Sequence, residues 1–236
     1  MKKKLMAFCG VLAAVIWLAS SGQKAVPADS RAEIWEETKY IALTFDDGPR
    51  EGTTDRLLDG LKERGANATF FLVGEQAAIN QDLVKRIRDE GHQVGNHTWS
   101  HVRLEGENTE KLLQEINRNE RLLREILRGE NYWLRPPYGA ISPAVQEKIG
   151  VPLIKWSVDP RDWESRDQKK IVDAVLGAVE PNSIILLHDI YPASVDAALE
   201  LVERLQKEGY WFVTVEELLR LNEIVPQAGS FYRSGE

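Results

Sequence analysis

Residues 41–49 read IALTFDDGP, an apolar run that leads directly into two aspartates, a glycine and a proline. An apolar run bounded by a Gly-Pro breaker is typical of a buried strand in an α/β fold, and such strands carry functional loops at their C-terminal ends. Two adjacent carboxylates, Asp46 and Asp47, are costly to hold together unless a cation lies beside them. A plain turn explains the same residues about equally well, because Asp, Gly and Pro are ordinary turn residues.

The length and composition indicate an ordinary globular body. The chain has 236 residues, of which 43% are hydrophobic and 28% charged, and this length suits one α/β barrel or two small domains. A single domain is the simpler interpretation. The formal net charge is −7 at pH 7, and no basic face is apparent that would neutralise phosphates. The composition therefore argues against nucleic acid as a partner.

The N-terminal residues differ from the rest of the chain. Lysines at positions 2–4 precede an uncharged apolar run, so residues 1–22 have the pattern of a secretory signal peptide or a membrane anchor. Residues 23–39 are polar and contain Pro27, which suits a linker. Cys9, the only cysteine, lies in the apolar run, so the remainder has neither a disulfide nor a cysteine-ligated metal. We expect an extracellular or cell-envelope protein, secreted or anchored by this segment.

From residue 40 onward, strand-like and helix-like segments alternate. We expect strands at residues 41–45, 68–73, 92–96, 132–135, 153–158, 184–188 and 211–215, and amphipathic helices at 53–64, 82–90, 109–127, 168–179 and 194–208. This alternation predicts a largely parallel sheet of about seven strands, closed or nearly closed into a barrel. We place the single domain at residues 40–222 and interpret residues 223–236 as a C-terminal tail.

The segment at residues 95–101, GNHTWSH, places His97 and His101 four residues apart. On a helical turn this spacing brings both imidazoles to one side, and two histidines with one carboxylate form a common open zinc site. A pair of buried or helix-capping histidines is the competing interpretation. The chain has only four histidines, however, and this pair follows the Asp-Asp loop. We interpret His92 as structural, because it lies within the preceding strand pattern.

Three further loops follow predicted strands. In RPPYG, residues 135–139, two prolines fix the backbone where a main-chain N–H has to point at one spot, and Arg135 can hold a carboxylate; a rigid turn is the alternative. In DPRDW, residues 159–163, surface salt links are the alternative to a functional Asp162. In LLHD, residues 186–189, His188 ends an apolar strand, and a nearby Asp162 would raise its pKa as a general acid requires. Five such loops at strand ends indicate one shared site.

Taken together, the five loops resemble the motifs of the polysaccharide deacetylases, carbohydrate esterase family 4. In chain order they read TFDDG at residues 44–48, HTWSH at 97–101, RPPY at 135–138, DPRDW at 159–163 and LLH at 186–188. The resemblance covers roughly residues 40–222, and the ordered set is highly specific although each motif alone is weak. It implies a distorted (β/α)7-type barrel, in agreement with the alternation of strands and helices.

The resemblance also implies roles for residues around the two aspartates. It makes Asp46 the general base and Arg135 the residue that orients it. It assigns Asp47, His97 and His101 to one divalent metal ion, zinc in the first place, with cobalt or another divalent ion as the alternative.

A second group of roles follows from the remaining motifs. The resemblance makes His188 the general acid, with Asp162 tuning it. The backbone N–H of Tyr138 would help to stabilise the oxyanion, and Tyr138 would also contact substrate. Trp163 and Leu186 would wall the pocket that receives the acetyl methyl group.

The implied reaction is metal-dependent hydrolysis of N-acetyl groups on an amino-sugar polymer, with release of acetate. For an envelope-directed protein we expect peptidoglycan as the substrate, with either N-acetylglucosamine or N-acetylmuramic acid as the target unit. Chitooligosaccharides, O-acetylated xylan and glycan binding without catalysis are the alternatives. The presence of both Asp46 and His188 speaks against the last. We expect the protein to act as a monomer.

Overall fold

The computed structural model describes residues 38–129 and 131–236. Its central strand is β1 (Lys39–Asp46), which becomes fully buried toward Asp46. β1 pairs with β2 (Thr69–Leu72), with β5 (Ile184–His188) and, near its start, with β6 (Tyr210–Phe212), while β3 (Gln93–Asn96) pairs with β2. All these pairs are parallel, so β1, β2, β3 and β5 end at one edge.

The sheet closes into a distorted barrel through short pairings. β4 (Leu153–Ile154) pairs in parallel with β7 (Phe231–Tyr232). Leu134 forms isolated parallel bridges to the last residue of β3 and to the first residue of β4, and Val158 forms one to β5. The α/β barrel expected from the sequence is therefore confirmed, with an irregular wall between β3 and β5.

Two strands predicted in this irregular wall, at residues 132–135 and 153–158, are shorter than expected. Only the two isolated bridges of Leu134 form in the first, and only β4 and the bridge of Val158 form in the second. Prolines flank both segments, at positions 136, 137, 152 and 160, and proline cannot donate a ladder hydrogen bond. The two loops that follow are therefore shaped by prolines as well as by pairing.

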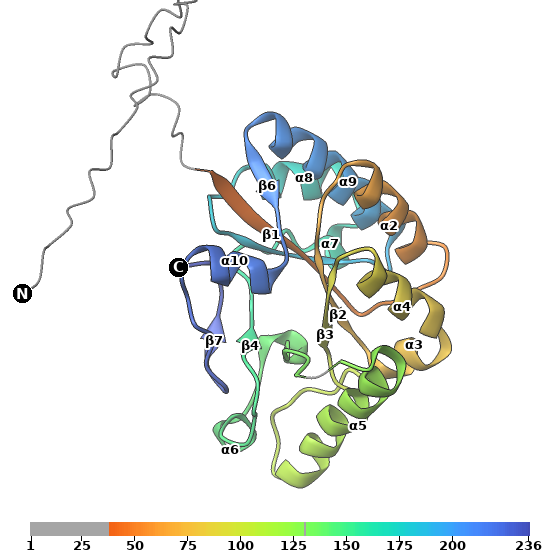
Figure 1. The fold of residues 1–236 in the computed structure, drawn as a ribbon, viewed down its shortest axis with the longest axis vertical. Coiled ribbons are helices and arrows are strands. Elements are labelled where there is room, and N and C mark those ends of the chain that lie inside the picture. The colour runs from red at the N-terminus through yellow and green to blue at the C-terminus, as the bar shows by residue number, and fades with distance from the viewer. Residues whose placement is uncertain (1–37, 130) are drawn as a thin grey trace, which may run out of the picture. The chain divides into compact units, whose positions relative to one another are not determined.

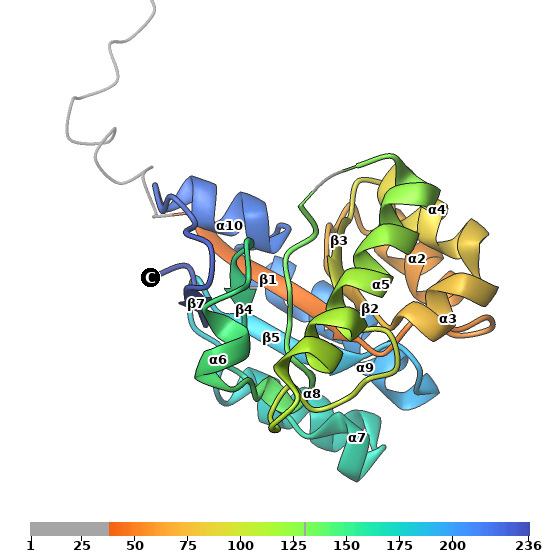
Figure 2. The ribbon, with the colours of Figure 1, turned by 90° about the horizontal axis from the view of Figure 1, so that it is seen from below.

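Helices cover the outside of the barrel (Figures 1 and 2). They are α2 (Thr54–Glu63), α3 (Gly74–Ile79), α4 (Gln81–Asp89), α5 (Thr109–Leu127), α6 (Pro143–Gln146), α7 (Asp162–Ser165), α8 (Gln168–Leu176), α9 (Pro192–Lys207) and α10 (Val215–Leu221), with a 3₁₀ turn η1 (Pro137–Gly139). The five predicted helices are present, and α5 has the predicted bounds. The sequence did not reveal α3, α6, α7 and α10, because each is too short to show a helical period.

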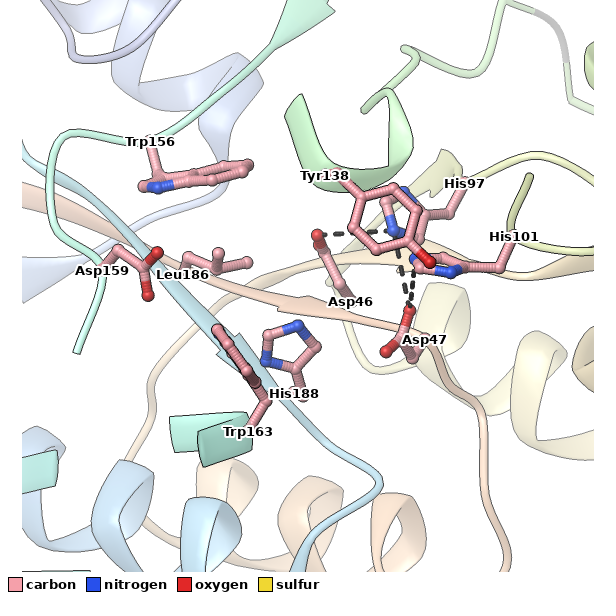
Figure 3. A pocket seen from close by; sticks show the side chains of 10 residues that line it. All are labelled: Asp46, Asp47, His97, His101, Tyr138, Trp156, Asp159, Trp163, Leu186 and His188. Carbon is pink, nitrogen blue, oxygen red and sulfur yellow. Dashed lines mark ion pairs between the residues drawn. The ribbon is translucent and has the colours of Figure 1, made fainter. Parts of the chain in front are cut away.

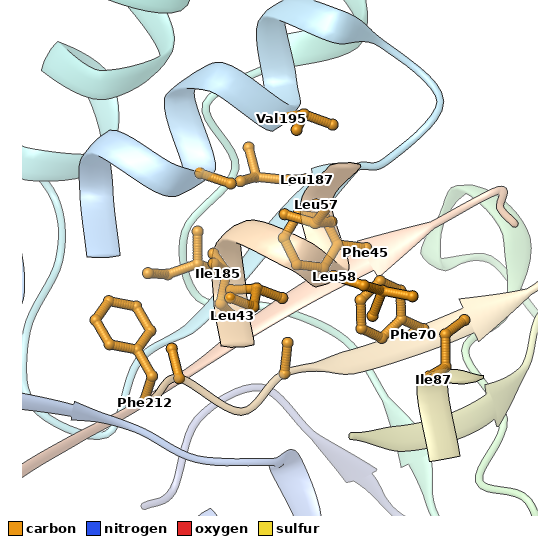
Figure 4. Close-up of a cluster of buried hydrophobic side chains, with 14 of the residues drawn as sticks. Leu43, Phe45, Leu57, Leu58, Phe70, Ile87, Ile185, Leu187, Val195 and Phe212 are labelled. Carbon is orange, nitrogen blue, oxygen red and sulfur yellow. The ribbon is translucent and has the colours of Figure 1, made fainter. Parts of the chain in front are cut away.

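The two faces of β1 explain how the core and the site share one strand. Leu43 and Phe45 are fully buried and face Leu57 of α2, Val195 of α9 and the same-face residues of β5 (Figure 4). Because side chains alternate along a strand, Thr44 and Asp46 face the other way. The apolar face thus anchors β1 against helices, while the opposite face carries polar groups toward the edge.

The chain ends differ from the sequence expectation in one respect. Residues 223–236, predicted as a tail, contribute β7 and pack with the body, which spans Thr38–Glu236. The predicted signal or anchor at residues 1–22 and nearly all of the linker at 23–39 lie outside the described residues. Among the described helices, none combines the length and apolar character needed to span a membrane.

Candidate active site

The register of the strands gathers the motif residues at one edge of the barrel. Asp46, the last residue of β1, is aligned with His188, the last residue of β5. On the other side of β1, β2 pairs with β3, and the last residue of β3 directly precedes His97. Residues from three separate motifs therefore meet although more than 40 positions separate each from the next.

A pocket of about 390 Å³ opens at this edge. It is lined by Asp46, Asp47, His97, His101, Tyr138, Trp156, Asp159, Trp163, Leu186 and His188 (Figure 3). Of the residues predicted from the sequence, only Arg135 and Asp162 do not line the pocket, and both are fully buried. The structure thus brings the predicted set to one place.

Asp47, His97 and His101 form a compact cluster on one side of the pocket. Their candidate ligand atoms all lie within 4.8 Å of one another. Asp47 Oδ1 is 3.6 Å from His97 Nε2 and 3.3 Å from His101 Nε2. Asp47 and His101 both have left-handed backbone conformations, with φ of 75° and 57°. Such strain in non-glycine residues is concentrated at functional sites.

The donor set fits a divalent metal ion. His97 Nδ1 lies 2.7 Å from the carbonyl oxygen of Arg135, which can only accept, so Nδ1 donates its proton and the Nε2 lone pair is left for a ligand. Burial, with the neighbouring His97 adding, lowers the pKa of His101, which favours the neutral imidazole that metals bind. Asp47 Oδ1 is buried and has no hydrogen-bond partner within the described part of the chain. A cation would satisfy it.

Asp46 is held by a buried arginine. Arg135 is fully buried and donates from one guanidinium nitrogen to Asp46 Oδ1, at 2.8 Å, and to Thr44 Oγ1, at 2.7 Å. The other terminal nitrogen donates to the carbonyl of Lys155 at 2.9 Å. Asp46 Oδ2 lies 3.6 Å from His97 Nε2, beside the cluster. Arg135 thus fixes one oxygen of Asp46 while the carboxylate stays on the pocket wall.

His188 lies on the opposite side of the pocket and is held by Asp162. Its Nδ1 is 2.8 Å from Asp162 Oδ1, and Asp162 Oδ2 accepts from the backbone N–H of His188 at 2.8 Å and from Ser194 Oγ at 2.6 Å. Burial alone would lower the pKa of His188, but the hydrogen bond and charge of Asp162, with further carboxylates beyond it, raise that pKa to about 9. Because Asp162 is fully buried, it is not part of a surface salt link.

Tyr138 lies at the mouth of the pocket, 60% exposed. It has a left-handed backbone conformation, φ 60° and ψ 11°, directly after two prolines. Its ring lies 4.9 Å from the His101 ring, edge to face, and the guanidinium of Arg103 lies 4.4 Å from its centroid. These contacts fix the side chain of a residue whose backbone is strained.

Sequence reasoning missed residues that support or line the site. Thr44 and Ser194 each hold one of the buried charged groups, and Trp156 lines the pocket. Thr44 could have been found, because it lies two residues before Asp46 on a strand and so faces the same side. Ser194 and Trp156 lie outside the motifs and carry no local signal.

Residues 35–152 match the family model described as polysaccharide deacetylase. The chain belongs to the polysaccharide deacetylase family. In Bacillus subtilis strain 168, the peptidoglycan-N-acetylmuramic acid deacetylase PdaC is 40% identical over 180 residues, covering 76% of this chain and 38% of PdaC. The peptidoglycan-N-acetylglucosamine deacetylase PgdA of Listeria monocytogenes strain 10403S is 39% identical, covering 76% of this chain and 39% of PgdA. The chain thus spans about two fifths of these relatives' lengths.

Solved structures of the family show the same fold. One structure of PdaC gives a TM-score of 0.77 at 38% identity, covering 79% of this chain and 93% of the solved chain. A family 4 acetyl xylan esterase from Clostridium thermocellum, in complex with a cobalt ion, gives 0.78 at 28% identity, covering 83% and 98%. Of these two solved proteins, the acetyl xylan esterase was solved with a cobalt ion, and the two names refer to different glycans.

Proposed function

We propose that this protein is a metal-dependent hydrolase that removes N-acetyl groups from peptidoglycan and releases acetate. The observation that carries the proposal is the single pocket in which an Asp-His-His cluster faces a histidine held by a buried aspartate. Similarity to two peptidoglycan deacetylases over three quarters of the chain supports the substrate class.

Asp47, His97 and His101 would hold one divalent ion, zinc in our proposal, with cobalt as the alternative. Such an ion supplies positive charge that polarises the amide carbonyl and makes water more acidic. Asp46, beside the cluster, would accept the proton of the attacking water as general base. Arg135 would keep Asp46 oriented for that transfer, because it holds Oδ1 by a charge-assisted hydrogen bond.

His188 would donate a proton to the departing amine nitrogen. A pKa of about 9 leaves it protonated at neutral pH, and Nδ1 is engaged by Asp162, so Nε2 is the nitrogen that delivers the proton. Asp162 would not contact the substrate; it would orient His188 and keep it protonated. The backbone N–H of Tyr138 would stabilise the oxyanion.

Trp163 and Leu186 would receive the acetyl methyl group. Both line the pocket on the side of His188 (Figure 3). Trp163 is 48% exposed, and Leu186 is buried, so together they offer an apolar wall that is open at one end. An acetyl group fits such a wall better than a charged substituent does.

We also propose that the protein works outside the cytoplasm, as a monomer. The pattern of residues 1–22 supports export by a signal peptide or attachment by a membrane anchor. An envelope location would bring the enzyme to peptidoglycan.

The test is to incubate the zinc-loaded protein with purified peptidoglycan and to measure acetate, locating each lost acetyl group by mass spectrometry. We expect acetate release that ends when a chelator removes the metal and resumes when zinc is restored. Asp46→Asn should lower the rate by at least about 100-fold, because an amide cannot act as the base. Full activity of the chelated protein, or of Asp46→Asn, would contradict the proposal.

A second candidate is esterase activity on O-acetylated xylan. The similarity to the acetyl xylan esterase favours it, and an ester is easier to cleave than an amide. Acetate release from xylan, peptidoglycan and chitooligosaccharides under the same conditions separates the candidates. The esterase proposal requires xylan to be the preferred substrate by kcat/KM.

A further inference from the structure

A second cavity, of about 430 Å³, lies directly beside the metal cluster. It shares Asp47 and His101 with the active-site pocket, so the cluster forms a common wall. Its other walls include Arg50, which follows β1, and Glu75 of α3. None of the roles proposed above uses this cavity. A substrate whose acetyl group reaches the cluster would therefore have a neighbouring substituent within reach of the second cavity.

Arg50 is a positioned cation within this cavity. Its side chain donates to the carbonyl oxygen of Ile190 at 3.1 Å, and the other guanidinium N–H groups have no hydrogen-bond partner among the described residues. Its backbone N–H donates to Thr54 Oγ1 at 2.8 Å, and the Thr54 hydroxyl donates to the fully buried carboxylate of Asp189. These two successive hydrogen bonds hold the backbone of Arg50 in place. Among the described residues, no carboxylate lies within ion-pair distance of its guanidinium.

The other polar groups of the cavity limit what it accepts. Gln76 and Ser100 offer neutral hydrogen-bonding groups, and the Ser100 hydroxyl is oriented by donating to Glu115 at 2.9 Å. Glu75 is a carboxylate and would repel a second negative group. Apart from the shared Asp47 and His101, which the metal ion would occupy, the cavity offers one cation, one anion and two neutral groups. These groups suit a substituent with a single carboxylate and nearby hydroxyl or amide groups.

Amino-sugar polymers offer such a substituent in one of their two common units. In N-acetylglucosamine the carbon next to the acetamido-bearing carbon carries a hydroxyl group. In N-acetylmuramic acid the same carbon carries a lactyl ether, which ends in a carboxylate or continues into a peptide that contains carboxylates. Overall similarity does not choose between the units, because the two relatives named for them are 40% and 39% identical to this chain.

We propose that the second cavity binds the carboxylate-bearing side chain of an N-acetylmuramic acid unit and that Arg50 pairs with this carboxylate. The proposal rests on the deacetylase function and names the sugar unit that the enzyme selects. Arg50 then acts in specificity, because its contact exists only for the acidic unit. The lactyl group and the attached peptide are two sources of the same carboxylate chemistry.

The test compares Arg50→Gln with the parent on three substrates of equal sugar length: a glycan with free lactyl groups, the same glycan with peptides attached, and a chitooligosaccharide. We expect the ratio of kcat/KM for a muramic acid substrate to that for the chitooligosaccharide to fall about tenfold, since a hydrogen-bonded charge pair is lost. Arg50→Lys should recover part of the ratio, because it restores the charge without the fork. Whichever acidic substrate shows the drop identifies the source of the carboxylate.

Arg56→Gln is the matched control. Arg56 is also an exposed arginine of this region, but it pairs with Asp196 and lines neither cavity. It should leave the ratio unchanged. An unchanged ratio in Arg50→Gln, or an equal loss on all three substrates, would overturn the proposal. Circular dichroism checks that both variants fold.

A failure of the proposed function gives a different result. If the parent deacetylates none of the three glycans, calorimetric titration of the metal-loaded protein with each glycan still tests Arg50. Weaker binding of the acidic glycans to Arg50→Gln than to the parent, with no such difference for the chitooligosaccharide, supports the cavity assignment. Equal affinities of parent and variant for the acidic glycans contradict it.

Discussion

The two sides of the active-site pocket are built in opposite ways. On one side, both carboxylate oxygens of Asp162 have hydrogen-bond partners. One oxygen contacts His188 Nδ1, and the other accepts two further hydrogen bonds. On the other side, Asp47 Oδ1 is buried with no hydrogen-bond partner among the described residues, and it lies on a strained backbone. The side of the proposed general acid is therefore organised by the protein alone, whereas the side of the proposed metal ligands would depend on an ion. This difference predicts which changes disable each side.

Metal removal should have the largest effect. Without the cation, neither the water nor the carbonyl is polarised, and we expect kcat to fall at least about 1,000-fold. The chelated protein should keep its secondary structure, because the cluster lies outside the hydrophobic core. Acetate release and circular dichroism, measured before and after dialysis against a chelator, check this. Loss of the fold on chelation would show that the metal side is structural as well.

Asp162→Asn should have the next largest effect, about 100-fold on kcat. The amide removes the negative charge that raises the pKa of His188 and replaces an acceptor by a donor. Metal content should be unchanged, because Asp162 does not contact the cluster. Rate measurements with metal analysis separate the two sides. A variant that loses zinc together with activity would show that the two sides of the pocket do not act independently.

Raising the pH should lower activity about tenfold for each unit above the pKa of His188, because the proposed general acid must be protonated. In the metal-free protein an NMR titration of His188 should give a value near 9. Zinc should lower it, since a cation offsets the aspartates that help to raise it. The pKa of His188 is higher in the folded protein than its ordinary value of 6.5, so the His188–Asp162 pair stabilises the fold fully below pH 6.5. This stabilisation is lost as the pH rises through about 9.

Ser194→Ala should have the smallest effect, a fewfold decrease in kcat. It removes one of the two hydrogen bonds to Asp162 Oδ2 but leaves the contact with His188 intact. The alkaline limb of the pH profile should move slightly to lower pH, because Asp162 loses a partner that orients it. A pH–rate profile measured beside that of Asp162→Asn checks the order. An effect as large as that of Asp162→Asn would mean that Ser194 determines the position of the aspartate.

The sequence predicted the regular parts of this molecule well. β5 and α5 have the expected bounds, because an apolar run and a long helical period are local patterns. The residues of the metal cluster and of the His188–Asp162 pair could be expected to meet, since they lie at or after the ends of strands that finish at one edge. The closure of the barrel could not be foreseen, because Leu134 and β7 pair through one or two residues with partners far along the chain.

The residues that support the site could be predicted from the sequence only in part. Thr44 shares a strand face with Asp46, so alternation alone places it there. Ser194 approaches Asp162 from the first turn of α9, a contact set by how α9 packs and not by any pattern near residue 162. Arg50 lies three residues after Asp47, yet only the cavity reveals what surrounds it.

β7 follows every other described strand in chain order, yet it lies behind Arg135, one of the fully buried charges of the site. The carbonyl of Tyr232 in β7 accepts from the backbone N–H of Lys155 at 2.8 Å, and the carbonyl of Lys155 accepts from Arg135 at 2.9 Å. As a chain emerges from the ribosome N-terminus first, the motifs appear well before the strand that braces Arg135. Nascent chains that carry all five motifs but not yet β7 should therefore leave this guanidinium without its final support, so that the proposed activity would arise only late in biosynthesis.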